Sequence, residues 1–399
     1  MGVVVQKYGG SSVGSAEKIK SVANTVIKRK RSGNDMVVVV SAMGDATDEL
    51  ISLAKSITPD PDKREMDALL STGEMVSCAL LAMALKDAGC DAVSYSAYQI
   101  QIKTSGPHGK SLINDIDVKK IKKSLREGKV VVIAGFQGVN EEGDITTLGR
   151  GGSDTTAVAA AVKLNGVCEI YTDVDGIYSV DPRKYKKAAK LEQIDYEEML
   201  ELSSLGAQVM HPRSIELGQK YDVPIYVGLS GSDIKGTIIK GAEKMEMESK
   251  PVTGIATSDD DIAVTLKDIP DDINILSNIF ESVAEKRINI DMISQTAPID
   301  GTVNISFTIP KEDLSECTAI IKKFTSKDNI IIDGNITKFS IAGIGMKTTS
   351  GVAAKLFKLF SENGIGVKMV TTSEIRITCA IDEKDSERAI KLAAKEFNL

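Results

Sequence analysis

Runs of consecutive Val and Ile residues, each followed by a helical segment, constrain the fold of this chain more than any other feature. Such runs bury both of their faces, which is typical of strands in a parallel sheet that helices cover on each side. We therefore expect an α/β fold with a mainly parallel sheet. The expected strands include Met36–Val40, Asp91–Ala97, Lys129–Phe136, Cys168–Val174 and Val223–Gly228, and the expected helices include Glu65–Ala88, Asn114–Glu127, Ser153–Leu164 and Gln208–Lys220.

In such sheets, ligands bind outside the carboxyl ends of the strands. Lys7, Ser41, Phe136 and Arg150 all come at or after the end of an expected strand. We therefore expect these side chains to gather at one edge of the sheet, where the chemistry takes place.

The segment Thr146–Asp154, TTLGRGGSD, is the strongest candidate for a ligand site. Its three glycines let the backbone approach a ligand closely, and the helix that follows offers unpaired N–H groups and a positive dipole end to an anion. Arg150 adds a planar fork for a carboxylate or phosphate. The alternative is that Ser153 or Asp154 is merely the N-cap of the helix. An arginine within a glycine run exceeds what a cap requires, so we favour the ligand site.

The first strand ends in QKYGGSSVG, where Lys7 precedes Gly9 and Gly10. This turn lacks the Walker spacing, but an ammonium group here could reach phosphates held by the N–H groups of the turn. The alternative is a tight turn with an exposed lysine. Glu74, in the helix LLSTGEMVSCALLAMAL, lies either on a solvent-facing stripe or inward to meet a cationic group, and the sequence leaves both open.

A second informative turn is CEIYTDVDGIYSVDPRKY. Thr172, Asp173, Tyr178 and Arg183 supply a hydroxyl, a carboxylate, a ring and a guanidinium, a mixture that suits a nucleotide. The alternative is a turn in which the Asp side chains bond only to their own backbone.

Composition excludes several classes of protein. A net charge of −7 and a pI near 5.2 argue against nucleic acid as a main partner. Five scattered cysteines suit a reducing cytoplasm, and two histidines make a metal–histidine site improbable, so we assign no metal ligands. We find no apolar run long enough to span a bilayer and no signal peptide, and expect a cytoplasmic protein without a membrane partner.

The C-terminal third contains an internal repeat after a charged linker, residues 241–251. Each copy reads strand, helix, strand, strand, helix. The first copy has a sixth element, the strand Asn329–Asp333, but the second ends after its helix. An unassigned strand, Val252–Thr257, precedes the first copy. We therefore expect the first copy to be inserted in the second, with Val252–Thr257 completing the sheet of the second, because this avoids an exposed edge.

These motifs together resemble the amino-acid kinase family, and among its members most closely the aspartokinases. The segments KYGGSSV, VSAMGDATDEL, LLSTGE, TTLGRGGSD, TDVDGIYSVDPR and MHPRS match family segments in order over essentially the whole chain. The repeat resembles the ACT domain, a sensor of small molecules. The resemblance implies a three-layer αβα kinase domain (1–240) and two ferredoxin-like βαββαβ ACT domains (262–333, and 252–257 plus 335–399). It also implies the reaction ATP + L-aspartate to 4-phospho-L-aspartate + ADP, which begins lysine, threonine and methionine synthesis.

The resemblance also implies roles for individual residues. Lys7 would stabilise charge on the transferred phosphoryl group, and Asp154 would organise Lys7. Glu74 would bind the substrate ammonium and Arg150 its α-carboxylate. Neutral donors to the substrate would be Ser41, Thr47, Gly152 and Ser153, and the nucleotide would be held by Lys7, Gly9, Gly10, Ser11, Ser12, Thr172, Asp173, Tyr178, Arg183 and Lys235. Mg²⁺ would arrive with ATP. Ser11 replaces the usual threonine, and Lys235 lies later in its segment than the family lysine.

The ACT units imply feedback inhibition by lysine, threonine or both, with lysine favoured, and a homodimer or dimer of dimers. The expected effector residues are Asp271, Asn274, Met292 and Gln295, with Asn274 able to adopt the left-handed conformation of the family glycine. The ACT units could instead serve only to dimerise. The whole chain could instead be a kinase for glutamate, acetylglutamate or a nucleoside monophosphate, or a non-catalytic amino-acid sensor. Arg150 and Glu74 together favour a free α-amino acid.

Overall fold

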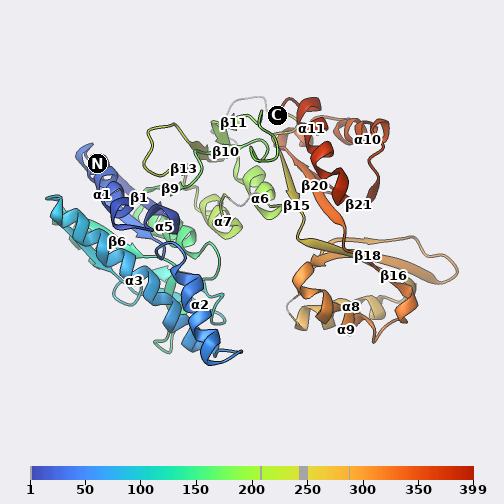
Figure 1. The fold of residues 1–399 in the computed structure, drawn as a ribbon, viewed down its shortest axis with the longest axis horizontal. Coiled ribbons are helices and arrows are strands. Elements are labelled where there is room, and N and C mark those ends of the chain that lie inside the picture. Colours follow the sequence, from blue (N-terminus) through green and yellow to red (C-terminus); the bar gives the residue numbers. More distant parts are fainter. Residues whose placement is uncertain (1, 207–208, 242–249, 287) are drawn as a thin grey trace. The chain divides into compact units, whose positions relative to one another are not determined.

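The computed structural model describes residues 2–206, 209–241, 250–286 and 288–399, and they form two compact units (Figure 1). The first unit comprises Met1–Ile177, Lys190–Ser203 and Gln208–Glu246, and the second comprises Tyr178–Ala189, Ser204–Ala207 and Met247–Leu399. Most of the expected linker 241–251, and the start of the expected helix Gln208–Lys220, lie outside the described residues.

A mainly parallel eight-stranded sheet runs through the first unit in the order β12-β14-β13-β9-β1-β2-β6-β3. Only β13 and β14 pair antiparallel among the described neighbours in this order. The predicted α/β class with a mainly parallel sheet is therefore confirmed. The strands are β1 (Val3–Tyr8), β2 (Asp35–Val40), β3 (Ala92–Tyr95), β6 (Val130–Ala134), β9 (Val167–Thr172), β12 (Gln193–Ile194), β13 (Ile225–Leu229) and β14 (Thr237–Ile239).

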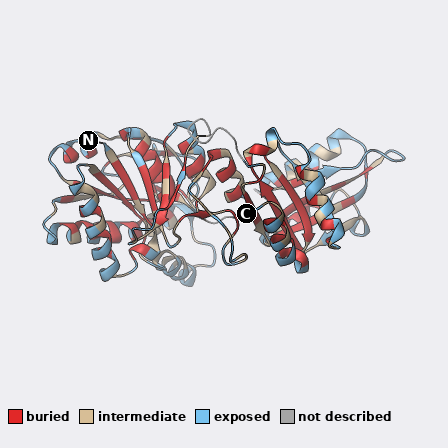
Figure 2. Ribbon diagram, turned by 90° about the horizontal axis from the view of Figure 1, so that it is seen from above, coloured by how far each residue is buried: buried red, intermediate tan, exposed pale blue. Residues whose placement is uncertain are grey.

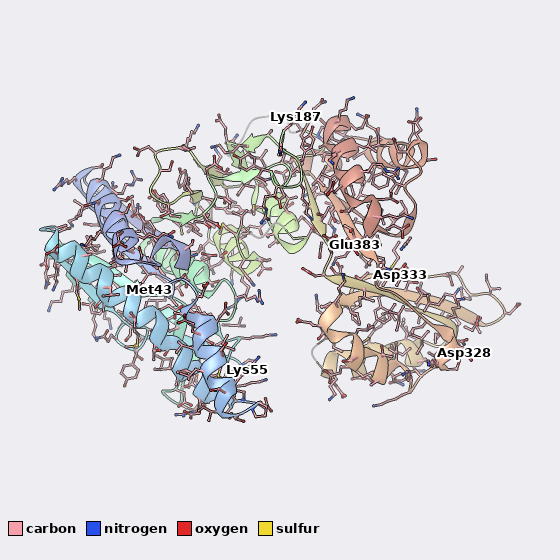
Figure 3. The ribbon with its side chains drawn as sticks, in the orientation of Figure 1. Met43, Lys55, Lys187, Asp328, Asp333 and Glu383 are labelled. Atoms are coloured by element: carbon pink, nitrogen blue, oxygen red, sulfur yellow. The ribbon has the colours of Figure 1, made fainter. Side chains whose placement is uncertain are left out.

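Helices cover both faces of this sheet, because its central strands are apolar on both sides (Figure 2). One face of β1, β2 and β6 packs with α1 and α3 in one core, against which Met43, labelled in Figure 3, is partly buried. The helix α5 packs on β1 and β2 and also contacts α7. The helices of this unit are α1 (Ala16–Arg31), α2 (Ala46–Ile57), α3 (Lys63–Asp87), α4 (Lys119–Arg126), α5 (Gly152–Leu164), α6 (Tyr196–Ser204) and α7 (Pro212–Lys220), with a 3-10 turn η1 (Gly10–Ser12).

A second, small sheet of the first unit was not predicted. It has the order β5-β4-β7-β8, with β4 (Ile102–Ser105), β5 (Leu112–Ile116), β7 (Gln137–Val139) and β8 (Ile145–Thr147). The predicted helix Asn114–Glu127 is therefore wrong in its first part, because β5 pairs antiparallel with β4 and α4 begins only at Lys119. The three-residue spacing of Ile113 and Ile116 suits a helix, whereas a strand places residues three apart on opposite faces. The pairing of β5 with β4, which contains a register shift, overrides this spacing.

The expectation that no apolar run reaches membrane-spanning length is wrong for α3. By length and composition alone, α3 is long and apolar enough to cross a membrane, the one such helix among the described residues. In the structure this helix begins at the N-cap Asp62, contacts α1, α2 and the strands β3, β6 and β8, and buries two carboxylates, Asp67 and Glu74.

The second unit contains two antiparallel four-stranded sheets. The order β17-β18-β16-β19 comes from one continuous stretch with the pattern βαββαβ. The order β15-β20-β22-β21 joins a strand that precedes this stretch with three that follow it. The elements are β15 (Gly254–Ser258), β16 (Asp261–Pro270), α8 (Ile273–Glu285), β17 (Asp291–Gln295), β18 (Thr302–Pro310), α9 (Leu314–Ile321), β19 (Ile330–Asp333), β20 (Ile336–Ala342), α10 (Val352–Glu362), β21 (Val367–Thr372), β22 (Arg376–Asp382) and α11 (Ser386–Glu396).

The described residues also form several short elements. The 3-10 turns η3 (Lys311–Asp313), η4 (Lys327–Asn329), η5 (Ile344–Lys347) and η6 (Glu383–Asp385) belong to the second unit. Two short strands, β10 (Ile177–Tyr178) and β11 (Lys190–Leu191), pair with each other where the chain leaves and re-enters the first unit.

Two lysines connect the sheets of the second unit. Lys338 of β20, with a side chain only 8% exposed, lies 3.1 Å from both Asp261 of β16 and Asp291 of β17. Lys368 of β21 lies 2.6 Å from Asp333, which is labelled in Figure 3. A nearly buried charge such as that of Lys338 is tolerated only when it is paired, so its two ion pairs help to fix how the two sheets meet.

Candidate active site

All residues predicted to be catalytic or to bind substrate line one cavity of the first unit, of about 340 Å³. This volume is in the range of small-molecule pockets. The cavity lies where β1, β2 and β6 end, with the start of α2, the middle of α3 and the start of α5 as its other walls. It is lined by Lys7, Gly10, Ser41, Ala42, Gly44, Thr47, Glu74, Phe136, Gly149, Arg150, Gly151, Gly152, Ser153 and Asp154.

Lys7 and Asp154 form an ion pair in the lining of this glycine-rich cavity. The distance from Lys7 Nζ to Asp154 Oδ1 is 2.6 Å, and the two side chains are 12% and 11% exposed. The alternative of an exposed lysine in a tight turn is therefore wrong. Lys7 comes from β1 and Asp154 from α5, which packs on β1, so helix packing fixes this pair.

The start of α5 presents its backbone to the cavity. The N-cap is Gly151, in the left-handed conformation with φ 68°, and none of the side chains that the structure describes caps the helix. Ser153 and Asp154 are therefore helical residues, and the alternative that one of them is the N-cap is wrong. The N–H groups of the first turn carry the positive end of the helix dipole, and residues 152–154 line the cavity, which suits an anionic ligand.

Gly151 is required by its surroundings as well as by its φ angle. A Cβ atom at this position would overlap the side chain of His211, the residue that caps α7. At Gly149, where φ is 76°, a Cβ atom would lie 2.9 Å from the carbonyl oxygen of Gly109. The turn thus approaches two other segments closely while it presents Arg150, which is exposed and lines the cavity.

Glu74 faces inward, which decides between the two orientations that the sequence left open. The residue is 3% exposed, and Oε1 accepts a hydrogen bond from the backbone N–H of Ala42 at 3.1 Å. The other oxygen, Oε2, is buried without a hydrogen-bond partner among the described residues. Burial raises the pKa of Glu74 from 4.5 to about 7, although the Ala42 bond opposes this effect. A buried, unpaired carboxylate oxygen in a cavity is a binding point for a cation.

The predicted nucleotide residues come from several segments. Gly10 lines the cavity, and Gly9, Ser11 and Ser12 belong to the same turn after β1. Thr172 ends β9, next to Asp173, to which its hydroxyl donates at 3.0 Å.

The remaining three come from later in the chain. Lys235 belongs to the first unit and pairs at 3.1 Å with Glu192, with its side chain 71% exposed. Tyr178 and Arg183 belong to the second unit, where Arg183 pairs with Asp181 at 2.8 Å. The role of all the predicted nucleotide residues stays a prediction.

The expected effector residues lie at the start of α8 and on β17. Asp272 caps α8 and accepts from the backbone and side-chain nitrogens of Asn274 at 2.8 and 2.9 Å. The expectation of a left-handed Asn274 is wrong, because Asn274 lies within the helix and the Asp272 cap makes that conformation unnecessary. Met292 is 3% exposed with φ 50°, Gln295 ends β17, and Asp271 donates its N–H to Gly301.

The sequence analysis did not identify several residues that support the cavity. Ala42 supplies the N–H group that orients Glu74, and Ser77 donates to the carbonyl of Ser41 at 2.6 Å, which joins α3 to the end of β2. Arg213 donates to the carbonyl oxygens of Leu148 and Ser111 at 2.6 and 3.0 Å. Backbone N–H groups leave no sequence signal, and only the MHPRS motif marked Arg213.

Comparison with known proteins identifies the class. Residues 2–228 match the amino acid kinase family, and residues 262–323 and 339–397 match an ACT domain family. The chain therefore belongs to the amino acid kinase family, with ACT domains in its C-terminal part.

Full-length relatives narrow the assignment to the aspartokinases. The chain is 48% identical to the aspartokinase of Bacillus sp. (strain MGA3) over 100% of this chain and 98% of that protein. It is 46% identical to aspartokinase 2 of Bacillus subtilis (strain 168), with the same coverage. Its fold matches E. coli aspartokinase III in complex with aspartate and ADP, with a TM-score of 0.84, 21% identity and complete coverage of both chains.

Proposed function

We propose that the cavity binds L-aspartate and transfers the γ-phosphoryl group of ATP to the β-carboxylate, giving 4-phospho-L-aspartate and ADP. The observation that carries this proposal is Glu74 Oε2, which has no hydrogen-bond partner among the described residues and lies in the same cavity as Arg150 and the Lys7–Asp154 pair. An unpaired carboxylate and a guanidinium in one cavity complement the ammonium and α-carboxylate of a free amino acid. The E. coli enzyme with the same fold is known in complex with aspartate and ADP.

The clamp orients the substrate so that its second carboxylate faces Lys7. Glu74 binds the ammonium and Arg150 the α-carboxylate, with Ser41, Thr47 and Ser153 as neutral donors around them. A β-carboxylate oxygen then forms a bond to the γ-phosphorus as the bond from that phosphorus to the β–γ bridging oxygen breaks, and ADP leaves with the electron pair. A carboxylate is already ionised at neutral pH, so no general base is needed.

The chain contributes to this step by positioning and by charge. Lys7, fixed by Asp154, neutralises charge on the equatorial oxygens of the transferred group, and the first turn of α5 adds its dipole. The ion pair with Asp154 places the Lys7 ammonium before the reaction, so no reorganisation is needed when the charge develops.

We further propose that ATP is held by Lys7, Gly9, Gly10, Ser11, Ser12, Thr172, Asp173, Tyr178, Arg183 and Lys235, and that Mg²⁺ is held by the nucleotide. Among the described residues no cluster of three or more His, Cys, Asp or Glu side chains forms a metal cage, and Asp154 is already paired with Lys7. The residues around the cavity therefore fit a Mg²⁺ ion that arrives bound to the phosphates of ATP. When bound, Mg²⁺ supplies charge neutralisation at the β- and γ-phosphates.

For the C-terminal part, we propose one ACT domain of residues 252–257 plus 335–399, with a second, 262–333, inserted in it after a kinase domain (1–240) and a linker (241–251). The antiparallel pairing of β15 with β20 and the separate sheet of β16–β19 support this division.

These domains would bind lysine, threonine or both through Asp271, Asn274, Met292 and Gln295. The bound amino acid would inhibit the kinase domain, which would catalyse the first step of lysine, threonine and methionine synthesis. They would also pair two chains into a dimer or a dimer of dimers. Five free cysteines suit the reducing cytoplasm, where we place the enzyme.

The test is a coupled assay of ADP release with aspartate, glutamate, N-acetylglutamate and UMP as acceptors. We expect release with aspartate, trapping of the acyl phosphate as a hydroxamate, and inhibition by lysine or threonine, added separately and together. Equal rates with N-acetylglutamate would contradict the role of Glu74, because that compound has no ammonium group. Indifference to both amino acids would remove the regulatory part of the proposal.

A further inference from the structure

The turn that carries Arg150 is anchored to the helix that carries Glu74. The strand β8 ends at Thr147, and Arg150 follows three residues later. The backbone N–H of Ser111 donates to the carbonyl oxygen of Thr147 at 3.0 Å, and Gly149 lies directly against the carbonyl of Gly109. The segment around residues 108–111 is therefore the support on which the Arg150 turn lies.

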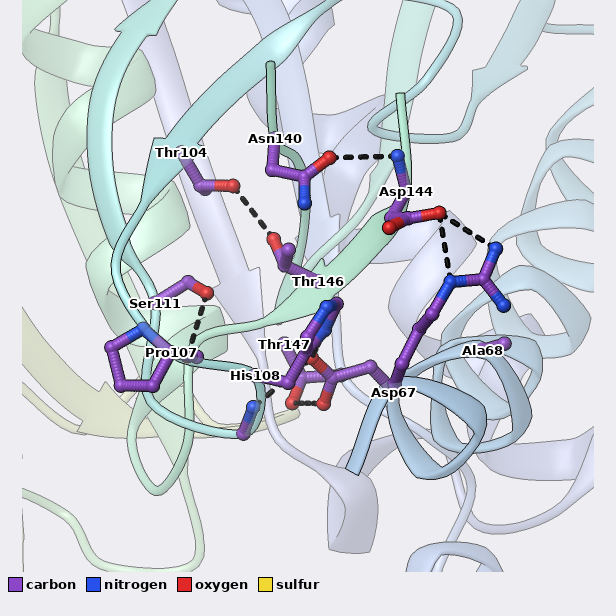
Figure 4. Close-up of polar contacts among 12 residues, drawn as sticks. Asp67, Ala68, Thr104, Pro107, His108, Ser111, Asn140, Asp144, Thr146 and Thr147 are labelled. Carbon is purple, nitrogen blue, oxygen red and sulfur yellow. Dashed lines mark hydrogen bonds and ion pairs between the residues drawn. The ribbon is translucent and has the colours of Figure 1, made fainter. Parts of the chain in front are cut away.

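Asp67 joins this support to α3. Its side chain is 1% exposed, and its carboxylate lies at the centre of three hydrogen bonds (Figure 4). Oδ1 accepts from the hydroxyl of Thr147 at 2.5 Å, and Oδ2 accepts from the N–H of Gly109 at 3.0 Å and lies 2.8 Å from Nδ1 of His108. One buried carboxylate thus connects α3 to both β8 and the supporting segment.

Asp67 and Glu74 lie on the same face of α3. They are separated by seven residues, which is about two helical turns, and both are buried. Yet Asp67, Thr147 and His108 do not line the cavity, whereas Glu74 and Arg150 do. The two binding points for the amino acid are therefore on elements that Asp67 ties together.

We propose that Asp67 is a positioning residue for the amino-acid substrate, which fixes the spacing between Glu74 and Arg150. The inference rests on the proposed function, because it assumes that these two residues bind the ammonium and α-carboxylate. Arg213 holds the same turn from another side, through the carbonyl of Leu148. Because the backbone of the turn is held at Thr147 and at Leu148, the backbone position of Arg150 is fixed although its side chain is exposed.

A carboxylate is suited to this task in a way that an amide is not. Asp67 faces hydrogen-bond donors from two different segments and has two oxygens that accept from them. An asparagine has one acceptor oxygen. If that oxygen keeps the N–H of Gly109 and the ring of His108, the NH₂ group faces the Thr147 hydroxyl, which must then turn from donor to acceptor. Hydrogen bonds of a neutral amide are weaker than those of a carboxylate, so the connection between α3, β8 and the supporting segment loosens.

The expected effect is specific to one substrate. Arg150 and Glu74 bind the amino acid in both the ground state and the transition state, so their misplacement raises KM for aspartate by a larger factor than it lowers kcat. The phosphate-binding Lys7–Asp154 pair is held by the packing of α5 on β1 and not by Asp67. KM for ATP should therefore stay the same.

The experiment compares Asp67→Asn and Thr147→Val with Asp144→Asn in the full chain. Asp144 directly precedes β8 at the end away from the turn and pairs with Arg64 at 2.7 Å, so it is a matched acid-to-amide control beside the same strand. We expect KM for aspartate to rise about 10- to 100-fold in Asp67→Asn and less in Thr147→Val. Neither variant should change KM for ATP, and Asp144→Asn should leave both constants as in the wild type.

A double-mutant cycle distinguishes positioning from a general loss of stability. If Asp67 acts through Arg150, then Asp67→Asn adds little to KM for aspartate in an Arg150→Ala background, whereas independent effects multiply. Thr147→Val, which removes one hydroxyl, keeps the test informative if Asp67→Asn folds poorly. Any of three results would overturn the inference. KM for ATP could rise in parallel with KM for aspartate, the effects of Asp67→Asn and Arg150→Ala on KM for aspartate could multiply in full, or KM for aspartate could stay unchanged in both Asp67→Asn and Thr147→Val.

The same assay separates this inference from the proposed function. If the wild type releases no ADP with aspartate, or if Arg150→Ala alone keeps the wild-type KM, the proposed function is wrong and the inference falls with it. If both of those results are as expected and Asp67→Asn behaves as the wild type, only the inference is wrong.

Discussion

Replacing Glu74 by Gln should make the ligand-free protein more stable while it weakens aspartate binding. Burial raises the pKa of Glu74 from 4.5 to about 7. Between these values the folded state keeps a proton that the unfolded state has lost, so the contribution of Glu74 to stability decreases as the pH rises. At about 1.4 kcal/mol per tenfold change in the acid dissociation constant, the ionised group destabilises the fold by up to about 3 kcal/mol at pH 8.

Glu74→Gln removes this effect, because a neutral amide gives up no proton. We expect the free energy of unfolding of the variant to exceed that of the wild type by up to about 3 kcal/mol at pH 8, and by less than about 1 kcal/mol at pH 5. The measurement is denaturation at both pH values without ligand. Because the chain has two compact units, the transition to follow is the one that added aspartate shifts in the wild type.

Glu65→Gln is the matched control, since Glu65 lies on the same helix with a side chain 68% exposed. The kinetic counterpart is a rise in KM for aspartate, because an amide cannot form an ion pair with the substrate ammonium. In the wild type the same pairing predicts that kcat/KM for aspartate falls as the pH drops below about 7, where Glu74 becomes protonated. A Glu74→Gln variant with the same stability as the wild type at pH 8, or with normal aspartate turnover, would refute the reasoning.

Two further predictions test the glycine-rich cavity. Lys7→Ala should lower kcat by about 10²- to 10³-fold while aspartate binding, measured by calorimetry, is retained, because Lys7 acts on charge that develops in the transition state; wild-type turnover would exclude this role. Gly151→Ala should lower both activity and stability, since the φ of 68° alone disfavours other residues by about 1–2 kcal/mol and the added methyl group would overlap His211. A Gly151→Ala protein that melts and turns over like the wild type would show that this turn tolerates another conformation.

Much of the site could be predicted from the sequence because it follows from local patterns. The Val-rich runs indicate strands that are buried on both faces, and parallel strands place their carboxyl ends together, so Lys7, Ser41 and Arg150 were expected at one edge. The structure places them around one cavity. The repeat in the C-terminal third likewise indicated two units of the same plan, because the order of strand and helix signals is a local property.

Other features could not be predicted in this way. The sequence left open whether Glu74 faces solvent or the interior, because the residues around it in the helix are apolar or small and form no clear polar stripe. The spacing of Ile113 and Ile116 is that of a helix, and only the pairing of β5 with β4 makes this segment a strand. Asp67 gave no signal, since its three partners lie about 40 to 80 residues away in the chain.

The sequence by itself thus determined the kinds of element, their order and which turns carry reactive side chains, since backbone propensity and hydrophobic periodicity act over a few residues. Only the tertiary structure decided that Glu74 is buried with one oxygen that no described residue pairs, that Gly151 rather than Ser153 or Asp154 caps α5, and that Asp67 ties α3 to the Arg150 turn. The physical reason is that burial and hydrogen-bond partners depend on which distant segments pack together, and the partners of a buried charge are fixed only when that packing is complete.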